Sequence, residues 1–466
     1  MVGERLTGVS SGQVKHRDNP RKRSGRTRKS PPATVVVMYG RSLISLVIAH
    51  SLGKRGIEVI TCDDVDLTAC SFSRYVRRSF VHAPIDRNPQ RFLDDLETRL
   101  RKLRPTDGRP YALIPVFRET TIIASNRERF AGFMSVAVPP EQSIRAVHPK
   151  DSLLRTARRL GLPVPSTWDP DGDGEELHHL AEILRYPVLI KPRDEVGGRG
   201  IVKCHSFPEV QVAFARYRQE RGESPLIQEY AAGEDYCLTV LYDRGRRIAD
   251  MAYRNLYRFP VESGAGIVRE TVESAPFLET ADLLMRDVQW HGIVELDFRW
   301  NPAVGTEPLL IEVNPRFWAG LFHSVESGVD FPWLLYQLAV EGHANPSSDA
   351  LIGQRTKVPG LWLLSAIHDT VASDAGFENL RTAWQEAWSS QNEQTGRDVL
   401  HRVSGILDSG VDIRDTYDTI RSILREGRQA KNDVFFRDDP LILLGVFFVL
   451  GSLIRHGKLP PEMRNR

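Results

Sequence analysis

Three polar side chains occupy alternate positions of one short stretch, PLLIEVNPRFWAGL: Glu312, Asn314 and Arg316. Successive side chains of a strand point to opposite faces, so these three share one face, and Ile311 and Val313 take the other. An apolar strand that carries a carboxylate, an amide and a guanidinium on one side is suited to binding a charged ligand or a metal ion.

Glu295 supplies a second carboxylate for the same face. It lies in HGIVELDFRW, a strand that we expect to pair with LLIEVNP through the turn NPAVGTEP. Oxygen ligands on two paired strands suit Mg²⁺, which takes few protein carboxylates together with phosphate oxygens and water. Glu295, Glu312 and Asn314 are therefore the candidate ligands, with Asp297 ranked below them. The alternative is a structural ion-pair network of Glu295, Glu312 and Arg316.

Lys191 ends the apolar strand YPVLIK, and a glycine-rich loop follows it in PRDEVGGRGIVKC. Gly197, Gly198 and Gly200 let backbone N–H groups approach phosphate oxygens closely. A lysine beside such a loop adds a point charge for the same oxygens. An ordinary turn remains the alternative for the loop taken alone.

A third element is the stretch LIQEYAAGEDYCLTV, in which an apolar strand runs into Gln228, Glu229 and Tyr230. Backbone groups at this point are suited to an adenine edge, and Glu234 is near enough in sequence to meet ribose hydroxyls. Without the other two elements, an exposed acidic loop between strands would explain the same residues.

The elements that must position these residues form two successive units. Residues 33–145 begin with ATVVVMYG, RSLISLVIAHSLGKRG and IEVITCDD, which predict a strand, a helix and a strand of a parallel sheet. The turn after the first strand reads YGRSLIS and lacks GxGxxG, which argues against a nicotinamide site. Residues 146–345 alternate strands with loops in an α+β pattern, and residues 346–466 are predicted to be mainly helical.

In this order, the motifs resemble those of the ATP-grasp enzymes of the carboxylate–amine ligase type, with a fold like that of the carbamoyl-phosphate synthase large chain. The resemblance runs from about Arg41 to Gly342 and is carried by HPKDSLLRTARRLGLPVPST, YPVLIKPRDEVGGRGI, LIQEYAAGED, GIVELDF and LLIEVNPRFWAGL. It implies a Rossmann-like pre-ATP-grasp domain, a two-lobed ATP-grasp domain and a C-terminal extension.

The resemblance also implies a role for each motif residue. Lys150 and Lys191 would hold the α- and β-phosphates. The remaining roles are the loop over the β- and γ-phosphates (Gly197, Gly198, Arg199, Gly200), the adenine hinge (Gln228, Glu229, Tyr230), the ribose contact (Glu234), the Mg²⁺ ligands (Glu295, Glu312, Asn314), and the arginines toward substrate (Arg316, with Arg258 and Arg269 as weaker candidates). His323 is a candidate base or a packed residue.

The implied reaction joins a carboxylate to an amine. ATP phosphorylates the acid to an acyl phosphate, the amine attacks, and ADP and phosphate leave; Mg²⁺ or Mn²⁺ accompanies the nucleotide. Two alternatives stay open. The first is an ATP-binding regulatory module without turnover, and the second is a protein that acts through nucleic acid or a membrane.

Composition bounds these alternatives. The chain has 466 residues, with 62 basic and 60 acidic side chains, so its charge gives no general attraction to nucleic acid. Residues 1–32 form a basic stretch that we expect to be disordered. Leu441–Ile454 is apolar but shorter than a bilayer span, which leaves a core helix or peripheral membrane contact. Four cysteines without CxxC spacing favour the cytoplasm. A homodimer is a further expectation.

Overall fold

The computed structural model describes residues 31–170, 174–193, 200–259, 265–345, 349–358 and 430–440. Residues 1–30 of the predicted basic tail, most of the predicted helical region after residue 346, and the apolar segment Leu441–Ile454 lie outside these ranges. Within the described ranges, no helix combines the length and the apolar character needed to cross a bilayer.

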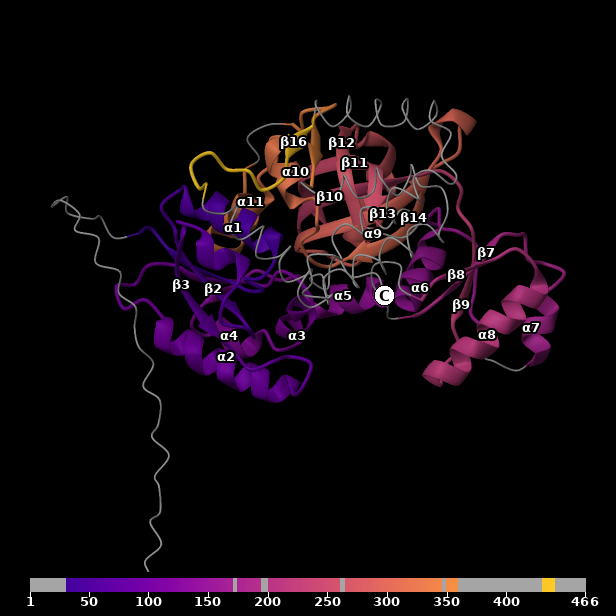
Figure 1. The fold of residues 1–466 in the computed structure, drawn as a ribbon, viewed down its shortest axis with the longest axis horizontal. Helices are drawn as coiled ribbons and strands as arrows, with labels where there is room; N and C mark the ends of the chain where they lie inside the picture. The colour runs from indigo at the N-terminus through magenta and orange to yellow at the C-terminus, as the bar shows by residue number, and fades with distance from the viewer. Residues whose placement is uncertain are drawn as a thin grey trace, which may run out of the picture. The chain divides into compact units, whose positions relative to one another are not determined.

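The N-terminal part, coloured indigo to violet in Figure 1, is built on a five-stranded sheet. The strand order is β3-β2-β1-β4-β5, and all of its strand pairs are parallel. The predicted strand–helix–strand start is confirmed, whereas the two edge strands β3 and β5 were not predicted. The elements are β1 (Thr34–Val37), α1 (Leu43–Gly53), β2 (Glu58–Asp63), a 3₁₀ turn (Ala69–Phe72), β3 (Val76–Val81), α2 (Pro89–Leu103), β4 (Tyr111–Ile114), α3 (Glu119–Ser125), α4 (Glu128–Ala131), β5 (Ser135–Val136) and α5 (Glu141–Val147).

A four-stranded antiparallel sheet follows, in the order β6-β9-β7-β8. Val188 and Ile190 of β7 pack into a small core with α8, so Leu189 and Lys191 point to the opposite face. We call this the small sheet. Its elements, with the helix before it, are α6 (Lys150–Leu160), β6 (Thr167–Trp168), α7 (Gly174–Leu180), β7 (Val188–Lys191), β8 (Val202–Cys204), α8 (Phe207–Arg221) and β9 (Leu226–Glu229).

The third sheet has seven strands in the order β14-β13-β10-β11-β12-β15-β16 and is called the large sheet here. Its neighbours are antiparallel except for β15 and β16. The elements are β10 (Glu234–Asp243), β11 (Arg246–Phe259), β12 (Ala265–Val272), α9 (Ala275–Asp287), β13 (Gly292–Trp300), a 3₁₀ turn (Pro302–Val304), β14 (Leu309–Asn314), α10 (Leu321–Glu326), α11 (Phe331–Glu341), β15 (Arg355–Lys357) and β16 (Lys431–Asn432).

A bulge in β14 changes which side chains reach the apolar face of the large sheet. Asp297 pairs with Glu312 and Phe298 pairs with Leu310, so Ile311 is the extra residue between two pairs. Leu310 and Val313 are buried in the core, and Ile311 is half-buried. The expectation that Ile311 lies on the apolar face is therefore wrong, and Leu310 takes that place.

Residues 430–440, called the strap here, connect the large sheet to the N-terminal part. The strap begins as β16 beside β15, and further along Phe436 stacks on His50 of α1 with ring centroids 3.6 Å apart. Asp438 accepts hydrogen bonds from Tyr75 Oη at 2.5 Å, and Asp439 accepts one from Ser73 Oγ at 2.5 Å. The end of the described chain thus packs against its beginning.

Candidate functional site

Four polar side chains of β13 and β14 lie on one face of the large sheet, which we call the acidic face: Glu295, Asp297, Glu312 and Asn314. The two strands pair as predicted, with Glu295 opposite Asn314 and Asp297 opposite Glu312. Directly opposed residues of an antiparallel pair share a face, so the register brings all four together. The structure thus gathers the three predicted ligands and adds Asp297 between them.

Hydrogen bonds hold these side chains in place. Tyr253 Oη on β11 donates to Glu295 Oε1 at 2.7 Å, and Asn314 Nδ2 donates to Asp297 Oδ2 at 3.1 Å. The Asn314 amide oxygen accepts from Arg316 Nη2 at 3.2 Å. Glu295, Asp297 and Asn314 therefore each have a hydrogen-bonded neighbour that sets the orientation of the side chain.

Burial makes the acidic face costly to keep ionised. Glu295 is only 7% exposed, and burial raises its pKa, with the nearby Arg316 guanidinium acting in the opposite direction. Burial also raises the pKa of Asp297 well above its usual range, and the charges of Glu295 and Glu312 add to the rise. A cation bound between these carboxylates would remove the repulsion that they impose on one another.

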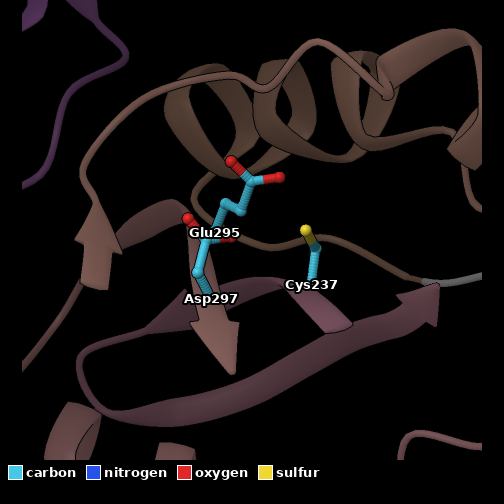
Figure 2. A group of neighbouring side chains, drawn as sticks. All are labelled: Cys237, Glu295 and Asp297. Carbon is cyan, nitrogen blue, oxygen red and sulfur yellow. The ribbon is translucent and has the colours of Figure 1, made fainter. Parts of the chain in front are cut away.

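The donor atoms at this face fit a divalent cation. One oxygen from each of Glu295 and Asp297 and the sulfur of Cys237 lie within 4.8 Å of one another, from the adjacent strands β13 and β10 (Figure 2). Hard carboxylate oxygens suit Mg²⁺. The Cys237 thiol does not, and burial raises its pKa well above the usual range, so it stays protonated. Sequence reasoning did not identify Cys237 as part of this face.

The small sheet contributes Lys191, which is 6% exposed at the end of β7. Its ammonium group donates to Gln228 Oε1 on β9, and Gln228 Nε2 donates in turn to Thr167 Oγ1 at 2.9 Å. Burial lowers the pKa of Lys191 to about 8, with Glu312 opposing the shift and Lys150 adding to it. Two of the predicted nucleotide residues, Lys191 and Gln228, are thus in direct contact.

Glu312 links this lysine pair to the acidic face. Lys150, the first residue of α6, places Nζ 3.6 Å from Glu312 Oε1. Lys191 also feels the Glu312 charge. The two predicted phosphate lysines and the predicted metal strand therefore meet at one carboxylate. Of the predicted metal ligands, Glu312 is the one turned toward the lysines.

The predicted adenine and ribose residues are only partly gathered. Glu229 ends β9, and its N–H donates to the backbone of Ser166 at 2.9 Å. Tyr230 comes next, and its Oη accepts from Arg299 Nη2 at 3.1 Å. Glu234 instead accepts from Arg254 Nη1 at 3.2 Å, on the face of β10 opposite to Glu295. The structure does not bring Glu234 to the lysines.

The predicted glycine loop is described only at its end. Gly197, Gly198 and Arg199 lie outside the described residues. Gly200 has φ +66°, and a Cβ there would approach Pro192 Cγ to 3.0 Å, so the backbone here favours glycine for both reasons.

The predicted arginines are more buried than a solvated hairpin would allow. Arg269 is 2% exposed and pairs with Asp433 of the strap at 2.9 Å, and its charge opposes the burial-driven rise in the pKa of Glu295. Arg258 pairs with Asp235. His323 bonds both ring nitrogens to threonine hydroxyls at 3.0 and 3.1 Å, and burial lowers its pKa to about 3, which favours the packed alternative over a base.

Comparison with known proteins gives matches to parts of the chain. Residues 222–357 match the family model described as "ATP-grasp in the biosynthetic pathway with Ter operon". The chain is 26% identical over 185 residues to the carbamoyl phosphate synthase large chain of Pyrococcus furiosus, which covers 38% of this chain and 17% of that protein. It is 29% identical over 92 residues to the D-alanine–D-alanine ligase of Fusobacterium nucleatum, which covers 20% of this chain and 27% of that protein.

A solved structure resembles the chain over a larger share of its length. Biotin carboxylase from Campylobacter jejuni aligns with a TM-score of 0.55 at 16% identity, covering 69% of this chain and 74% of the other. At that identity the likeness shows the fold, whereas the two curated relatives are each matched over less than a third of their own length. Residues 222–357 thus match an ATP-grasp family model, and the fold over 69% of the chain is similar to that of biotin carboxylase.

Proposed function

We propose that this chain is an ATP-dependent ligase that joins a carboxylate to an amine and releases ADP and phosphate. The observation that carries the proposal is the meeting of Lys150 and Lys191 with Glu312, which extends from the acidic face. Cationic and anionic groups arranged in this way would bind a metal–nucleotide complex from two sides. A relative named as a D-alanine–D-alanine ligase supports the same class of reaction.

The chemistry needs charge neutralisation and alignment more than a nucleophilic side chain. A carboxylate does not react with an amine directly, because oxide is a poor leaving group; transfer of the γ-phosphate makes an acyl phosphate that the amine can attack. Lys150 and Lys191 would bind the phosphates, and Arg316, beside Asn314, would meet the acid. Domain boundaries at residues 33–145 and 146–345 remain part of this proposal.

Glu295 and Asp297 are the residues that would hold Mg²⁺, with Glu312 and Asn314 at its edge. When bound, the ion would neutralise phosphate charge and orient the phosphates. The side chains themselves keep a buried anionic face ready, with Tyr253 fixing Glu295 and Asn314 fixing Asp297. Lys191, with a pKa of about 8, is cationic at neutral pH and can lie against phosphate oxygens.

The test uses the purified full chain with ATP and Mg²⁺ and a panel of amino acids, peptides and small carboxylic acids. Hydroxylamine replaces the unknown amine, because it converts an acyl phosphate to a hydroxamate whatever the natural acceptor. We expect one class of acid to stimulate release of ADP and phosphate and to give its hydroxamate. Release of AMP and pyrophosphate would overturn the proposal. ATP binding without turnover on any acid would favour the silent regulatory module.

A further inference from the structure

Two stacked aromatic rings, each with a guanidinium group against it, link the N-terminal sheet to the acidic face. Arg41 Cζ lies 5.4 Å from the centre of the Tyr39 ring, and Tyr39 stacks on Phe117 with centroids 5.5 Å apart at 18°. Arg316 Cζ lies 4.8 Å from the centre of the Phe117 ring. We call these four side chains the cation–aromatic column. It is a direct side-chain link between the N-terminal sheet and the acidic face.

Strand order brings the two rings together. Tyr39 follows β1 and Phe117 follows β4, and these strands are parallel neighbours, so both residues lie at the same carboxyl edge of the sheet. Tyr39 has φ +57°, a left-handed conformation that a bulky non-glycine residue adopts at a cost of about 1 kcal/mol or more. The fold thus holds a strained residue at the point where its ring meets Phe117.

Phe117 has little freedom to move. Its side chain is 4% exposed, and Glu119 Oε1 accepts hydrogen bonds from the backbone N–H groups of Val116 at 2.9 Å and Phe117 at 3.1 Å. Thr120 N donates to the Phe117 carbonyl oxygen at 3.0 Å. The Phe117 ring is therefore a fixed surface against which a flexible side chain can pack in one orientation.

Arg316 is the flexible side chain at that surface. Its Nη1 donates to the backbone of Phe317 at 3.0 Å and its Nη2 to Asn314 Oδ1 at 3.2 Å. The guanidinium charge also acts on the buried carboxylates of Glu295 and Asp297. The Arg316 side chain is long and lies beside two buried acids. Rotation of its guanidinium group onto those carboxylates would be electrostatically favourable. A ring against its planar face opposes that rotation, because cation–π attraction is lost when the guanidinium turns away.

We propose that Phe117, backed by Tyr39, is a positioning residue that holds the Arg316 guanidinium toward the incoming carboxylate and away from the carboxylates of Glu295 and Asp297. The N-terminal sheet thereby completes the acid-binding side of the site. This inference rests on the proposed function, because that function gives Arg316 its role. It gives the N-terminal part a role in holding the arginine that binds the reacting carboxylate of the substrate.

The experiment compares Phe117→Leu, which keeps an apolar side chain but removes the π face, with Phe117→Tyr, which keeps the ring. Phe130→Leu is the matched control, because Phe130 is a fully buried phenylalanine of α4 that packs near Phe133. We expect Phe117→Leu to lower kcat/KM for the acid about tenfold and to leave KM for ATP within about twofold. Phe117→Tyr should restore the wild-type value, and Phe130→Leu should change neither constant.

Two results would overturn the inference: a Phe117→Leu enzyme that behaves like Phe130→Leu, or a Phe117→Tyr enzyme as impaired as Phe117→Leu. A second measurement separates this failure from failure of the proposed function. In denaturant unfolding, Phe117→Leu and Arg316→Gln should be non-additive by about fivefold in the unfolding equilibrium constant. Additive effects in an active enzyme reject the column alone. No ADP release with any acid, together with non-additive unfolding, rejects the function alone.

Discussion

The large and small sheets present opposite charges to the candidate site, and they hold those charges in different ways. Glu295 and Asp297 of the large sheet are fixed by Tyr253 and Asn314, which belong to the same sheet. Lys191 of the small sheet is fixed by Gln228, but the carboxylate that balances its charge, Glu312, comes from the large sheet. The anionic side is thus built within one sheet, whereas the cationic side is balanced only where the sheets approach.

This difference has an energetic meaning. A buried anion needs compensation, and the charges of Arg316 and Arg269 offset only part of the cost of burying Glu295. The acidic face is therefore prepared for a metal ion at the expense of stability. The lysine pair differs, because Glu312 already neutralises part of its positive charge before any phosphate binds. The following variants test the acidic face and the lysine pair separately.

The largest effect is expected for Glu295→Gln. The amide can still accept from Tyr253 but cannot neutralise a cation, so kcat should fall about 10²- to 10³-fold, while the free energy of unfolding is not lowered. ADP release and denaturant unfolding measure the two quantities. Glu307→Gln, in the exposed loop between β13 and β14, is the control. An inactive enzyme that is also markedly less stable would point instead to a structural ion-pair network.

Lys191→Met should weaken ATP binding about 10- to 100-fold, which corresponds to the loss of one charge-assisted hydrogen bond of about 1.5–3 kcal/mol. Calorimetric titration with ATP and Mg²⁺ measures the affinity. Lys54→Met, at the exposed end of α1, provides the control. An unchanged affinity would mean that Lys191 serves the fold of the small sheet rather than the nucleotide.

The Lys191 pKa of about 8 predicts a pH dependence. The ammonium is charged below that value, so ATP affinity should fall as pH rises from about 7 to 9, and Lys191→Arg should flatten the profile. Stability has the opposite sign, because the unfolded lysine, with its ordinary value of 10.5, binds more protons between about 8 and 10.5; the contribution of Lys191 therefore rises with pH in that window. A wild-type affinity that is flat over this range would contradict the prediction.

The smallest effect is expected for Cys237→Ser. The thiol is protonated and soft, so Mg²⁺ affinity and kcat should change less than about threefold. Cys204→Ser, a buried cysteine of the small sheet, reports the general cost of such a substitution. A large loss of Mg²⁺ affinity confined to Cys237→Ser would place sulfur among the ligands, against the hard-oxygen assignment.

The acidic face could be predicted from the sequence, because the residues that form it lie close together in the chain. Glu295 and Glu312 belong to two strands joined by a short turn, and a period of two places Glu295 with Asp297 and Glu312 with Asn314 on common faces. Ile311 was misplaced, because a bulge inserts one residue without any glycine or proline to mark it. Cys237 was missed, because β10 was predicted but its register with β13 was not; the Cys237–Asp297 pairing supplies that step.

The contact of Lys150 with Glu312 depends on packing rather than on local pattern. Lys150 begins α6 and Glu312 lies in β14, so their 3.6 Å approach follows from how a helix and two sheets are arranged. Likewise, the cation–aromatic column depends on the carboxyl edge of the N-terminal sheet reaching Arg316. Sequence pattern and spacing do not give the distance between residues of different sheets. Contacts between sheets can therefore be recognised only in the three-dimensional structure.

The contacts of the strap can form only long after its partner residues have been synthesised. Ser73 and Asp439 are 366 residues apart in sequence, and a ribosome that adds about 5–20 residues per second needs about 20–70 s to travel that far. During this interval the surface around His50 and Tyr75 has emerged, but Phe436 and Asp438, which will cover it, have not been made. The aromatic surface of the nascent chain therefore stays uncovered until the strap has been synthesised, and only then can these contacts form.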